Sequence, residues 1–251
     1  MSMTTFERLQ RVRDERGAGF LALLDPDRQD KEDIVRRAEI CVEEGVDALL
    51  FGGSFLISTN FEGMIRAVKR AVPDVPLVIF PGDTTQISAA ADAILFLSMI
   101  SGRNPALLIG QHVKAAPAIR AHGIEPISTG YVLVESGVQT TVEYVSDTKP
   151  IPRRKPEIAM AHALAAEYLG MACVYLDAGS GADRMVPVEM IRAVKDYVSI
   201  PVIVGGGIRQ PEDARARVEA GADFVVIGTA FEGGADASRI EAFARAIHTQ
   251  S

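Results

Sequence analysis

The chain has few of the residues that build disulfide scaffolds or zinc sites. Its 251 residues include two cysteines, Cys41 and Cys173, each inside an apolar stretch. Two such cysteines exclude a disulfide framework and a four-ligand zinc site, and they fit a reducing, cytoplasmic setting. The histidines show no metal-ligand spacing and fall in expected helices or at helix ends, so we expect them to be surface residues. They are His112, His122, His162 and His248.

Positive charge is also scarce. The chain carries 26 Lys and Arg against 33 Asp and Glu, a formal net charge of −7. Binding to a nucleic-acid backbone depends mainly on clustered Lys and Arg, so we expect no nucleic-acid partner and any phosphate to be held locally. The one compact basic run is Arg153, Arg154 and Lys155, which fits either a solvated loop or electrostatic help for a diphosphate.

Long apolar runs are missing. The first 19 residues are polar and charged, and no later segment reaches the roughly 18 uninterrupted apolar residues of a membrane span. We therefore expect a protein that is neither exported nor membrane-spanning. At 48% hydrophobic and 24% charged residues, the composition is that of an ordinary globular protein with a sizeable core.

Short apolar runs that end in Gly or Asp alternate with longer amphipathic stretches of helical period, a pattern typical of βα repeats. Eight such runs, together with a length near the roughly 250 residues of a (β/α)8 barrel, predict a single TIM-barrel domain over residues 1–251. The expected strands are Phe20–Leu24, Ala48–Phe51, Leu77–Phe80, Ala93–Leu97, Glu125–Val134, Ala172–Leu176, Val202–Val204 and Phe224–Ile227.

One barrel helix is expected to be missing or reduced. Only the dozen residues PGDTTQISAAAD, 81–92, separate the third and fourth expected strands, too few for a full helix and two turns. The gap would either admit a long apolar ligand or be no more than a shortened connection. Residues 101–123 then read as a loop followed by a helix.

Glycines mark an expected phosphate site at the ends of the last two strands. The seventh strand runs into Gly205, Gly206 and Gly207, and the eighth into Gly228 and Thr229. The corresponding loops bind phosphate in many barrels of this fold, since glycine lets backbone N–H groups approach phosphate oxygens and a short following helix adds its positive N-terminus. The alternative is that these glycines only make tight turns.

Carboxylates end two other expected strands. Asp177 ends the sixth strand before a Gly-Ser loop, where it is a catalytic candidate or a loop cap. Asp25 and Ser54 follow the first two strands and offer the hard oxygen ligands that magnesium prefers. The alternatives there are a turn at Asp25 and a helix cap at Asp27.

Six segments carry a family resemblance: LALLDPDR, LLFGGS, ISTGYVLVE, VYLDAGSGA, VIVGGGI and VVIGTAFE. In this order and at these strand ends they closely resemble the geranylgeranylglyceryl phosphate synthase family, which comprises archaeal prenyltransferases of ether-lipid synthesis and bacterial heptaprenyl relatives. The resemblance spans nearly the whole chain.

The resemblance implies a set of site residues. It implies that sn-glycerol 1-phosphate places its phosphate against Gly206, Gly207, Gly228 and Thr229, and that Asp177 takes the proton of the acceptor hydroxyl. It implies that Asp25 and Ser54 help to bind Mg²⁺, which carries the diphosphate of a geranylgeranyl donor. The segment implied to hold the glycerol is Tyr175, Leu176, Asp177, Ala178, Gly179, Ser180 and Gly181.

Two positions depart from the family pattern. The resemblance would place Glu at position 177, where this chain has the shorter Asp, and Lys at position 28, where it has Arg. A water bridge or a deeper substrate would compensate for the missing methylene at Asp177.

The shared segments leave the donor open between geranylgeranyl, which we favour, and heptaprenyl. We expect the tail to lie along strands two to four and residues 81–91. A sugar-phosphate isomerase and a non-catalytic phosphate-binding barrel are rival interpretations. We further expect a homo-oligomer with at most transient membrane contact.

Overall fold

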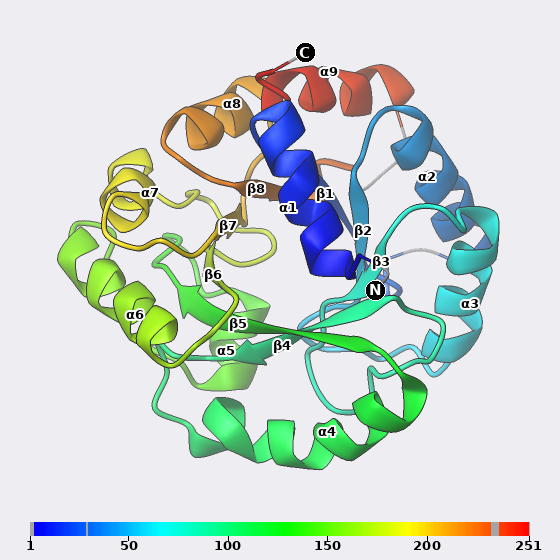
Figure 1. Ribbon diagram of the computed structural model, residues 1–251, viewed down its shortest axis with the longest axis horizontal. Helices are drawn as coiled ribbons and strands as arrows, with labels where there is room; N and C mark the ends of the chain where they lie inside the picture. Colours follow the sequence, from blue (N-terminus) through cyan, green and yellow to red (C-terminus); the bar gives the residue numbers. More distant parts are fainter. Residues whose placement is uncertain (1–2, 29, 232–235, 251) are drawn as a thin grey trace.

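The computed structural model describes residues 3–28, 30–231 and 236–250. Eight parallel strands close into a barrel in sequence order, with the last strand paired to the first (Figure 1). The predicted (β/α)8 barrel is thus confirmed. The strands are β1 Gly19–Leu24, β2 Ala48–Phe51, β3 Leu77–Ile79, β4 Ala93–Ser98, β5 Glu125–Leu133, β6 Cys173–Asp177, β7 Val202–Gly205 and β8 Phe224–Ile227.

Helices surround the barrel as an outer ring (Figure 1). Most have polar outer faces and bury an apolar stripe against the strands. In the described part of the chain none of them is long and apolar enough to cross a membrane. The helices are α1 Thr5–Arg16, α2 Lys31–Glu43, α3 Phe61–Ala71, η1 Ala106–Gly110, α4 Gln111–His122, α5 Thr141–Ser146, α6 Pro156–Tyr168, α7 Val188–Lys195, α8 Pro211–Glu219, η2 Thr229–Phe231 and α9 Ala237–Ile247.

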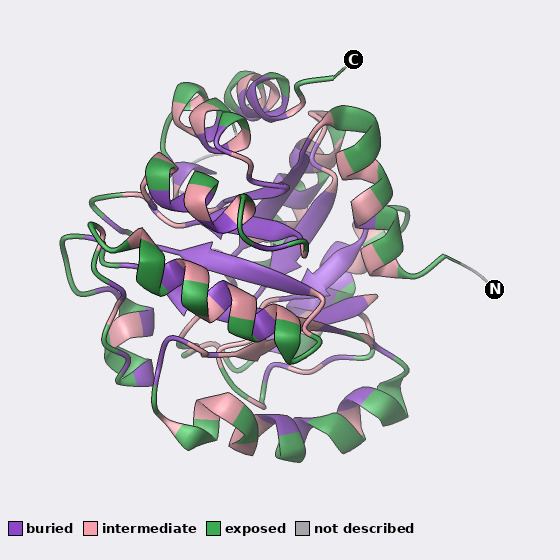
Figure 2. Cartoon of the chain, turned by 60° about the vertical axis from the view of Figure 1, so that its left-hand side comes forward, coloured by how far each residue is buried: buried purple, intermediate pink, exposed green. Residues whose placement is uncertain are grey.

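The expected gap in this ring is present. Residues 80–92, all of them described, form turns and extended chain without a helix between β3 and β4. The next helical segment, η1 with α4, lies as a separate layer outside β4 (Figures 1 and 2). The predicted loss of one barrel helix is therefore confirmed.

The core has two layers of side chains, one inside the barrel and one between the strands and the helices. Figure 2 shows the strands as buried and the surrounding helices as partly exposed. Successive side chains of a strand point to opposite faces, so alternate residues face the barrel interior and the helices. On β6, Cys173 and Tyr175 belong to the interior cluster, whereas Val174 and Leu176 pack in the layer under the helices. The same parity turns Asp177 toward the barrel axis.

Helix α1 closes the amino-terminal end of the barrel. It lies across the strand ends in Figure 1, and its Phe6 and Leu9 pack onto interior residues such as Leu21 and Phe224. Thr4 caps the helix and forms a capping box with Glu7. In the described part of the chain this end is therefore filled by side chains, and the large cavity lies at the carboxyl ends of the strands.

Two aspartates, Asp223 and the partly exposed Asp92, tie strands together at the closed end. Asp223, which precedes β8, accepts hydrogen bonds from the Val202 N–H at 2.7 Å and from Lys195 Nζ at 2.6 Å. Asp92 repeats the arrangement before β4, with the Leu77 N–H at 2.8 Å and Lys69 Nζ at 2.7 Å. Each carboxylate satisfies a strand-end donor that has no other strand to pair with.

We expect Asp223→Ala to lower the free energy of unfolding by about 3 kcal/mol, because it leaves a buried N–H and an ammonium group without their acceptor. Asp92→Ala is the matched comparison. The Asp92 side chain is 34% exposed against 9% for Asp223. Water can therefore replace more of the lost hydrogen bonds in Asp92→Ala, and the free energy of unfolding should fall less. Urea unfolding of both variants measures the difference; equal losses would contradict the dependence on burial.

Candidate active site

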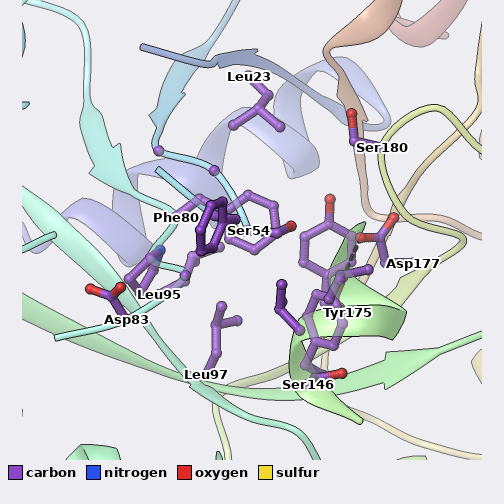
Figure 3. A pocket seen from close by; sticks show the side chains of 18 of the residues that line it. Leu23, Ser54, Phe80, Asp83, Leu95, Leu97, Ser146, Tyr175, Asp177 and Ser180 are labelled. Carbon is purple, nitrogen blue, oxygen red and sulfur yellow. Dashed lines mark hydrogen bonds between the residues drawn. The ribbon is translucent and has the colours of Figure 1, made fainter. Parts of the chain in front are cut away.

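A cavity of about 700 Å³ opens at the carboxyl ends of the strands. Its upper part is polar and lies over the barrel axis, and its apolar part continues past β3 and β4 toward α4. Figure 3 shows Asp177 and Ser180 on one side and Phe80, Asp83 and Leu95 on the other, with Leu97 below. One cavity therefore joins the residues predicted for phosphate, catalysis and metal binding to an apolar channel.

The predicted phosphate residues meet in its upper part. Gly206, Gly207, Gly228 and Thr229 all line the cavity, together with Ser180 from the loop after β6. The Ser180 and Thr229 hydroxyls lie 3.5 Å apart, and Thr229 begins the short helix η2 as predicted; residues 232–235 beyond it lie outside the described part. Glycine N–H groups, two hydroxyls and a helix start are suited to an anion.

Positive backbone dihedrals explain why glycine stands in this loop. Gly206 has φ 85° and Gly207 has φ 72°, in the region that side chains disfavour. A Cβ at Gly206 would lie 2.6 Å from the Gly179 nitrogen and 2.6 Å from Asp177 Oδ1. The backbone at Gly206 therefore packs directly against the catalytic candidate, which a larger residue would prevent.

Asp177 is held by the protein on both oxygens. The Tyr131 hydroxyl donates a short hydrogen bond to Oδ2, and the Gly179 N–H donates to Oδ1 at 2.9 Å. Burial raises the pKa of Asp177 above its ordinary value, although the hydrogen bonds from Tyr131 and from the Gly179 and Ala178 backbone act in the opposite direction. Asp177 is thus a fixed carboxylate of increased basicity.

Aromatic side chains form the floor below Asp177. The Tyr131 and Tyr175 ring centroids are 5.4 Å apart, and Phe80 stacks on Tyr175, also at 5.4 Å. Burial raises the pKa of both tyrosine hydroxyls well above the usual value, so both stay protonated donors. Tyr175 both packs in the barrel interior and lines the cavity.

Four of the predicted glycerol residues do not line the cavity. Leu176 and Ala178 are fully buried in the layer between strands and helices, because the alternation of β6 turns them away from the axis. The Ala178 N–H is already bonded to the Gly205 carbonyl at 3.2 Å, and the Gly179 N–H to Asp177. Gly179 and Gly181 shape the loop through positive φ values of 90° and 75°.

The predicted metal residues also reach the cavity. Asp25 and Ser54 both line it, and Asp25 Oδ1 would lie 3.3 Å from a Cβ at Gly53. Asp25 also accepts the Asp27 N–H at 2.9 Å, as in the turn considered from the sequence, and its Oδ2 is 3.7 Å from Arg28 Nε. The helix cap suggested for Asp27 is wrong: Asp27 accepts the N–H groups of Ile57 and Ser58, and Asp30 caps α2.

This donor set fits magnesium only in combination with a substrate. Among the described residues, no group of three or more His, Cys, Asp or Glu side chains gathers around one point. Magnesium commonly takes one or two protein oxygens and completes its octahedron with water and substrate phosphate. Asp25 and Ser54 are consistent with that mode of binding.

The apolar channel leaves the barrel through the gap in the helical ring. Its walls are formed by side chains of β4, the loop before it and the helical layer outside it. They include Phe80, Ile87, Ile94, Leu95, Phe96, Leu97, Met99, Leu107, Ala115 and Ile119. The shortened connection therefore opens onto an apolar channel, as one of the two alternatives from the sequence requires.

The expectation that all four histidines are surface residues is wrong for His112. The His112 side chain is buried against the channel. Its ring centroid lies 4.5 Å from that of Phe96, and its Nε2 lies 3.1 Å from Ser98 Oγ. Burial lowers its pKa, with the Leu97 carbonyl opposing this effect. From the sequence, a histidine at a helix start is expected to be exposed. His112 is buried because α4 lies as a second layer outside β4.

The basic run after β5 does not line the cavity. Arg153 donates to the backbone carbonyls of Glu135 at 3.1 Å and Met185 at 2.6 Å, and Lys155 pairs with Glu157 at 3.4 Å. The run thus braces loops near the active site.

Tyr131 was not identified as a site residue from the sequence. Tyr131 lies within the ISTGYVLVE segment, and its pairing opposite Tyr175 places its hydroxyl beside Asp177. Strand alternation was the available signal, because Tyr175 and Asp177 are two residues apart on β6 and share a face with the paired residue of β5.

Glycine loops with two hydroxyls, a buried carboxylate and an apolar channel meet in one cavity at the carboxyl ends of the strands, an arrangement typical of barrel enzymes that bind small phosphorylated ligands. The chain belongs to the PcrB family, whose model matches residues 10–247. Geranylgeranylglyceryl phosphate synthase of Chitinophaga pinensis is 48% identical over 91% of this chain and 90% of its own length. The Thermococcus kodakarensis enzyme of the same name is 48% identical over 87% and 86%.

Solved structures of other proteins have the same fold as this chain. The (S)-3-O-geranylgeranylglyceryl phosphate synthase of Thermoplasma acidophilum, in complex with its substrate sn-glycerol-1-phosphate, superposes with a TM-score of 0.93, covering 98% of this chain and 99% of that one at 36% identity. A thiamine phosphate pyrophosphorylase of Pyrococcus furiosus, with a TM-score of 0.60 at 15% identity, shares the fold alone.

Proposed function

We propose that the protein transfers a geranylgeranyl group from geranylgeranyl diphosphate to the 3-hydroxyl of sn-glycerol 1-phosphate, releasing diphosphate. The observation that carries this proposal is the position of Asp177. It is a buried, basic carboxylate between the glycine cradle and the apolar channel, where an acceptor hydroxyl and an apolar donor meet. The relatives named for this reaction support the same assignment.

The acceptor phosphate lies against the N–H groups near Gly206 and Gly207 and the hydroxyls of Ser180 and Thr229. Its glycerol then extends toward Asp177 over the Tyr175 ring. Positioning both substrates in this way removes most of the entropic cost of bringing them together.

Asp25 and Ser54 would hold magnesium together with the donor diphosphate. When bound, the ion neutralises the charge of the leaving group. Arg28, which also lines the cavity, adds a guanidinium on the same side.

The transfer is a substitution at the first carbon of the prenyl chain. The bond between this carbon and the diphosphate oxygen breaks, and its electron pair leaves with diphosphate. The glycerol oxygen forms the new ether bond to the same carbon, and its proton passes to Asp177. General-base help of this kind typically accelerates a reaction by about 10²- to 10⁴-fold.

The prenyl tail leaves the reacting carbon through the channel between β4 and α4. The channel walls offer apolar contact along its length, and the missing helix between β3 and β4 provides the exit. The relatives' names favour the geranylgeranyl donor over the heptaprenyl donor.

Incubation of the purified protein with sn-glycerol 1-phosphate and either donor, with magnesium or EDTA, tests the proposal. We expect magnesium-dependent ether product from geranylgeranyl diphosphate by mass spectrometry. Product mainly from heptaprenyl diphosphate would overturn the donor assignment. Binding of glycerol phosphate without any product would favour a non-catalytic barrel, and turnover in EDTA would argue against the metal.

Tyr131→Phe is expected to lower kcat and to move the acidic limb of the pH–rate profile to higher pH. The Tyr131 hydroxyl lowers the pKa of Asp177, so its loss raises that pKa and the active carboxylate forms only at higher pH. The KM for glycerol phosphate should change little. Tyr175→Phe, which removes a neighbouring buried hydroxyl, is the control; the same pH shift in both variants would refute the specific role of Tyr131.

We also propose a homo-oligomer. Tyr168 and Leu169 at the end of α6 and Tyr197 after α7 are 80%, 72% and 50% exposed on adjoining helices. Exposed apolar groups gathered on one face favour association. Light scattering after gel filtration gives the mass; a monomer at micromolar concentration would oppose the proposal.

A further inference from the structure

The loop that replaces the missing barrel helix buries a glutamine. Gln86 is 1% exposed, although it lies in a polar connection of residues 81–92. A primary amide is costly to bury unless its donor and acceptor are both satisfied. Gln86 Nε2 donates to the Gly53 carbonyl at 3.0 Å, and its Oε1 accepts from the Gly53 N–H at 3.4 Å. The side chain thus pairs with Gly53 as a neighbouring strand would.

The backbone around Gly53 is packed from both sides. A Cβ at Gly82, in the same loop as Gln86, would lie 2.4 Å from the Gly53 carbonyl oxygen and 2.7 Å from that of Ser54. On the opposite side, a Cβ at Gly53 would lie 3.3 Å from Asp25 Oδ1. Three loops, after β1, β2 and β3, therefore meet at this one residue.

This arrangement connects Gln86 to both residues of the proposed metal site. Ser54 follows Gly53 directly, and the Asp25 carboxylate lies against it, so the position of the Gly53 backbone sets the spacing between the Asp25 carboxylate and the Ser54 hydroxyl. Magnesium demands near-ideal octahedral geometry, and small displacements of its ligands weaken binding.

We propose that Gln86 is a positioning residue: its amide pairs with Gly53 and holds Asp25 and Ser54 at the spacing needed for a magnesium–diphosphate complex. This inference rests on the proposed function, because it assumes that these two residues face the donor diphosphate. It also gives the helix-free loop a second role, beyond opening the channel.

The test compares Gln86→Met, which keeps the side-chain length but loses both hydrogen bonds, with Gln86→Glu, which keeps an acceptor. Ser88→Ala is the matched control, because Ser88 is equally buried in the same loop and its hydroxyl accepts the Ala90 N–H within that loop. Isothermal titration calorimetry measures binding of inorganic diphosphate with Mg²⁺, and separately of sn-glycerol 1-phosphate. Steady-state kinetics give both KM values.

We expect Gln86→Met to weaken magnesium–diphosphate binding and raise the donor KM by about 10- to 100-fold, the range seen when groups that orient metal ligands are removed. Glycerol phosphate binding should stay within about twofold, since the cradle at β7 and β8 is separate. Gln86→Glu should lose less than Gln86→Met, and Ser88→Ala should match the wild type.

Unchanged magnesium–diphosphate binding in a folded Gln86→Met protein would overturn the proposal. An equal loss of glycerol phosphate binding in both Gln86 variants would do the same, since it would indicate general disruption. A wild-type protein that binds glycerol phosphate but no magnesium–diphosphate would instead refute the proposed metal site itself. The two failures are therefore distinguishable.

Discussion

Asp177→Asn is expected to lower kcat by about 10²- to 10⁴-fold while sn-glycerol 1-phosphate still binds. Asparagine keeps the shape of the side chain, but its single oxygen can accept from only one of the Tyr131 and Gly179 donors, and it cannot take a proton. The proposed phosphate site lies elsewhere, at the loops after β7 and β8, so the affinity for sn-glycerol 1-phosphate should change little. Single-turnover rates and calorimetric binding measure the two effects separately.

The same change is expected to stabilise the fold at neutral pH. Burial raises the pKa of Asp177, so the folded protein disfavours the charged carboxylate, and ionised Asp177 lowers the free energy of unfolding at every pH above its folded pKa. This loss disappears as the pH falls below the ordinary pKa of aspartate. Asparagine never ionises, so the Tm of the variant should exceed that of the wild type at pH 7, by about 2–4 °C for each kcal/mol regained.

The two proteins should converge toward acid pH, where wild-type Asp177 is neutral. A Tm gain that persisted unchanged below pH 4 would have a different cause, and a Tm loss at pH 7 would show that the hydrogen bonds to the carboxylate outweigh its desolvation. Near-normal turnover by Asp177→Asn would remove Asp177 from the chemistry.

Gly206→Ala is expected to raise the KM for sn-glycerol 1-phosphate by at least about 100-fold and to destabilise the protein. Two costs combine at this position. A left-handed backbone costs a non-glycine residue roughly 1–2 kcal/mol, and the new methyl group would lie within 2.7 Å of the Ala178 and Gly179 nitrogens, which cannot move without moving Asp177. Both the phosphate loop and the base are therefore displaced.

Gly181→Ala is the matched control, because it separates the two costs. Gly181 has a similar φ of 75°, but a Cβ there meets nothing within 4 Å. The Gly181→Ala variant should lose stability because of its strained backbone, but its KM for sn-glycerol 1-phosphate should rise much less. If the two variants had equal KM values, the contact of Gly206 with the Asp177 loop would have no role in binding.

Much of this architecture could be predicted from the sequence because it depends on local patterns. Eight apolar runs at βα spacing indicated the barrel, and the short interval at residues 81–92 indicated the missing helix. Glycines at the ends of β7 and β8 marked the phosphate loops, since few other residues tolerate the backbone conformation of Gly206 and Gly207.

Other features depend on which strands and layers become neighbours. Tyr131 and Asp177 are 46 residues apart, and only the pairing of β5 with β6 brings the hydroxyl to the carboxylate. His112 is buried because α4 lies over the channel, and Gln86 because three loops converge on Gly53. The contacts of His112 and Gln86 leave no period or spacing in the sequence, and the alternation that marks Tyr131 becomes informative only once β5 and β6 are paired.

By itself, the sequence determined the barrel, the chain positions of the glycine loops and the presence of a carboxylate at the end of β6, because periodicity, glycine conformation and strand ends are properties of short segments. Only the tertiary structure decided that Asp177 is buried and made more basic, that Leu176 and Ala178 face away from the cavity, and that an apolar channel joins the glycine loops. Burial and desolvation arise from the packing of distant segments, and these in turn set the chemistry of the site.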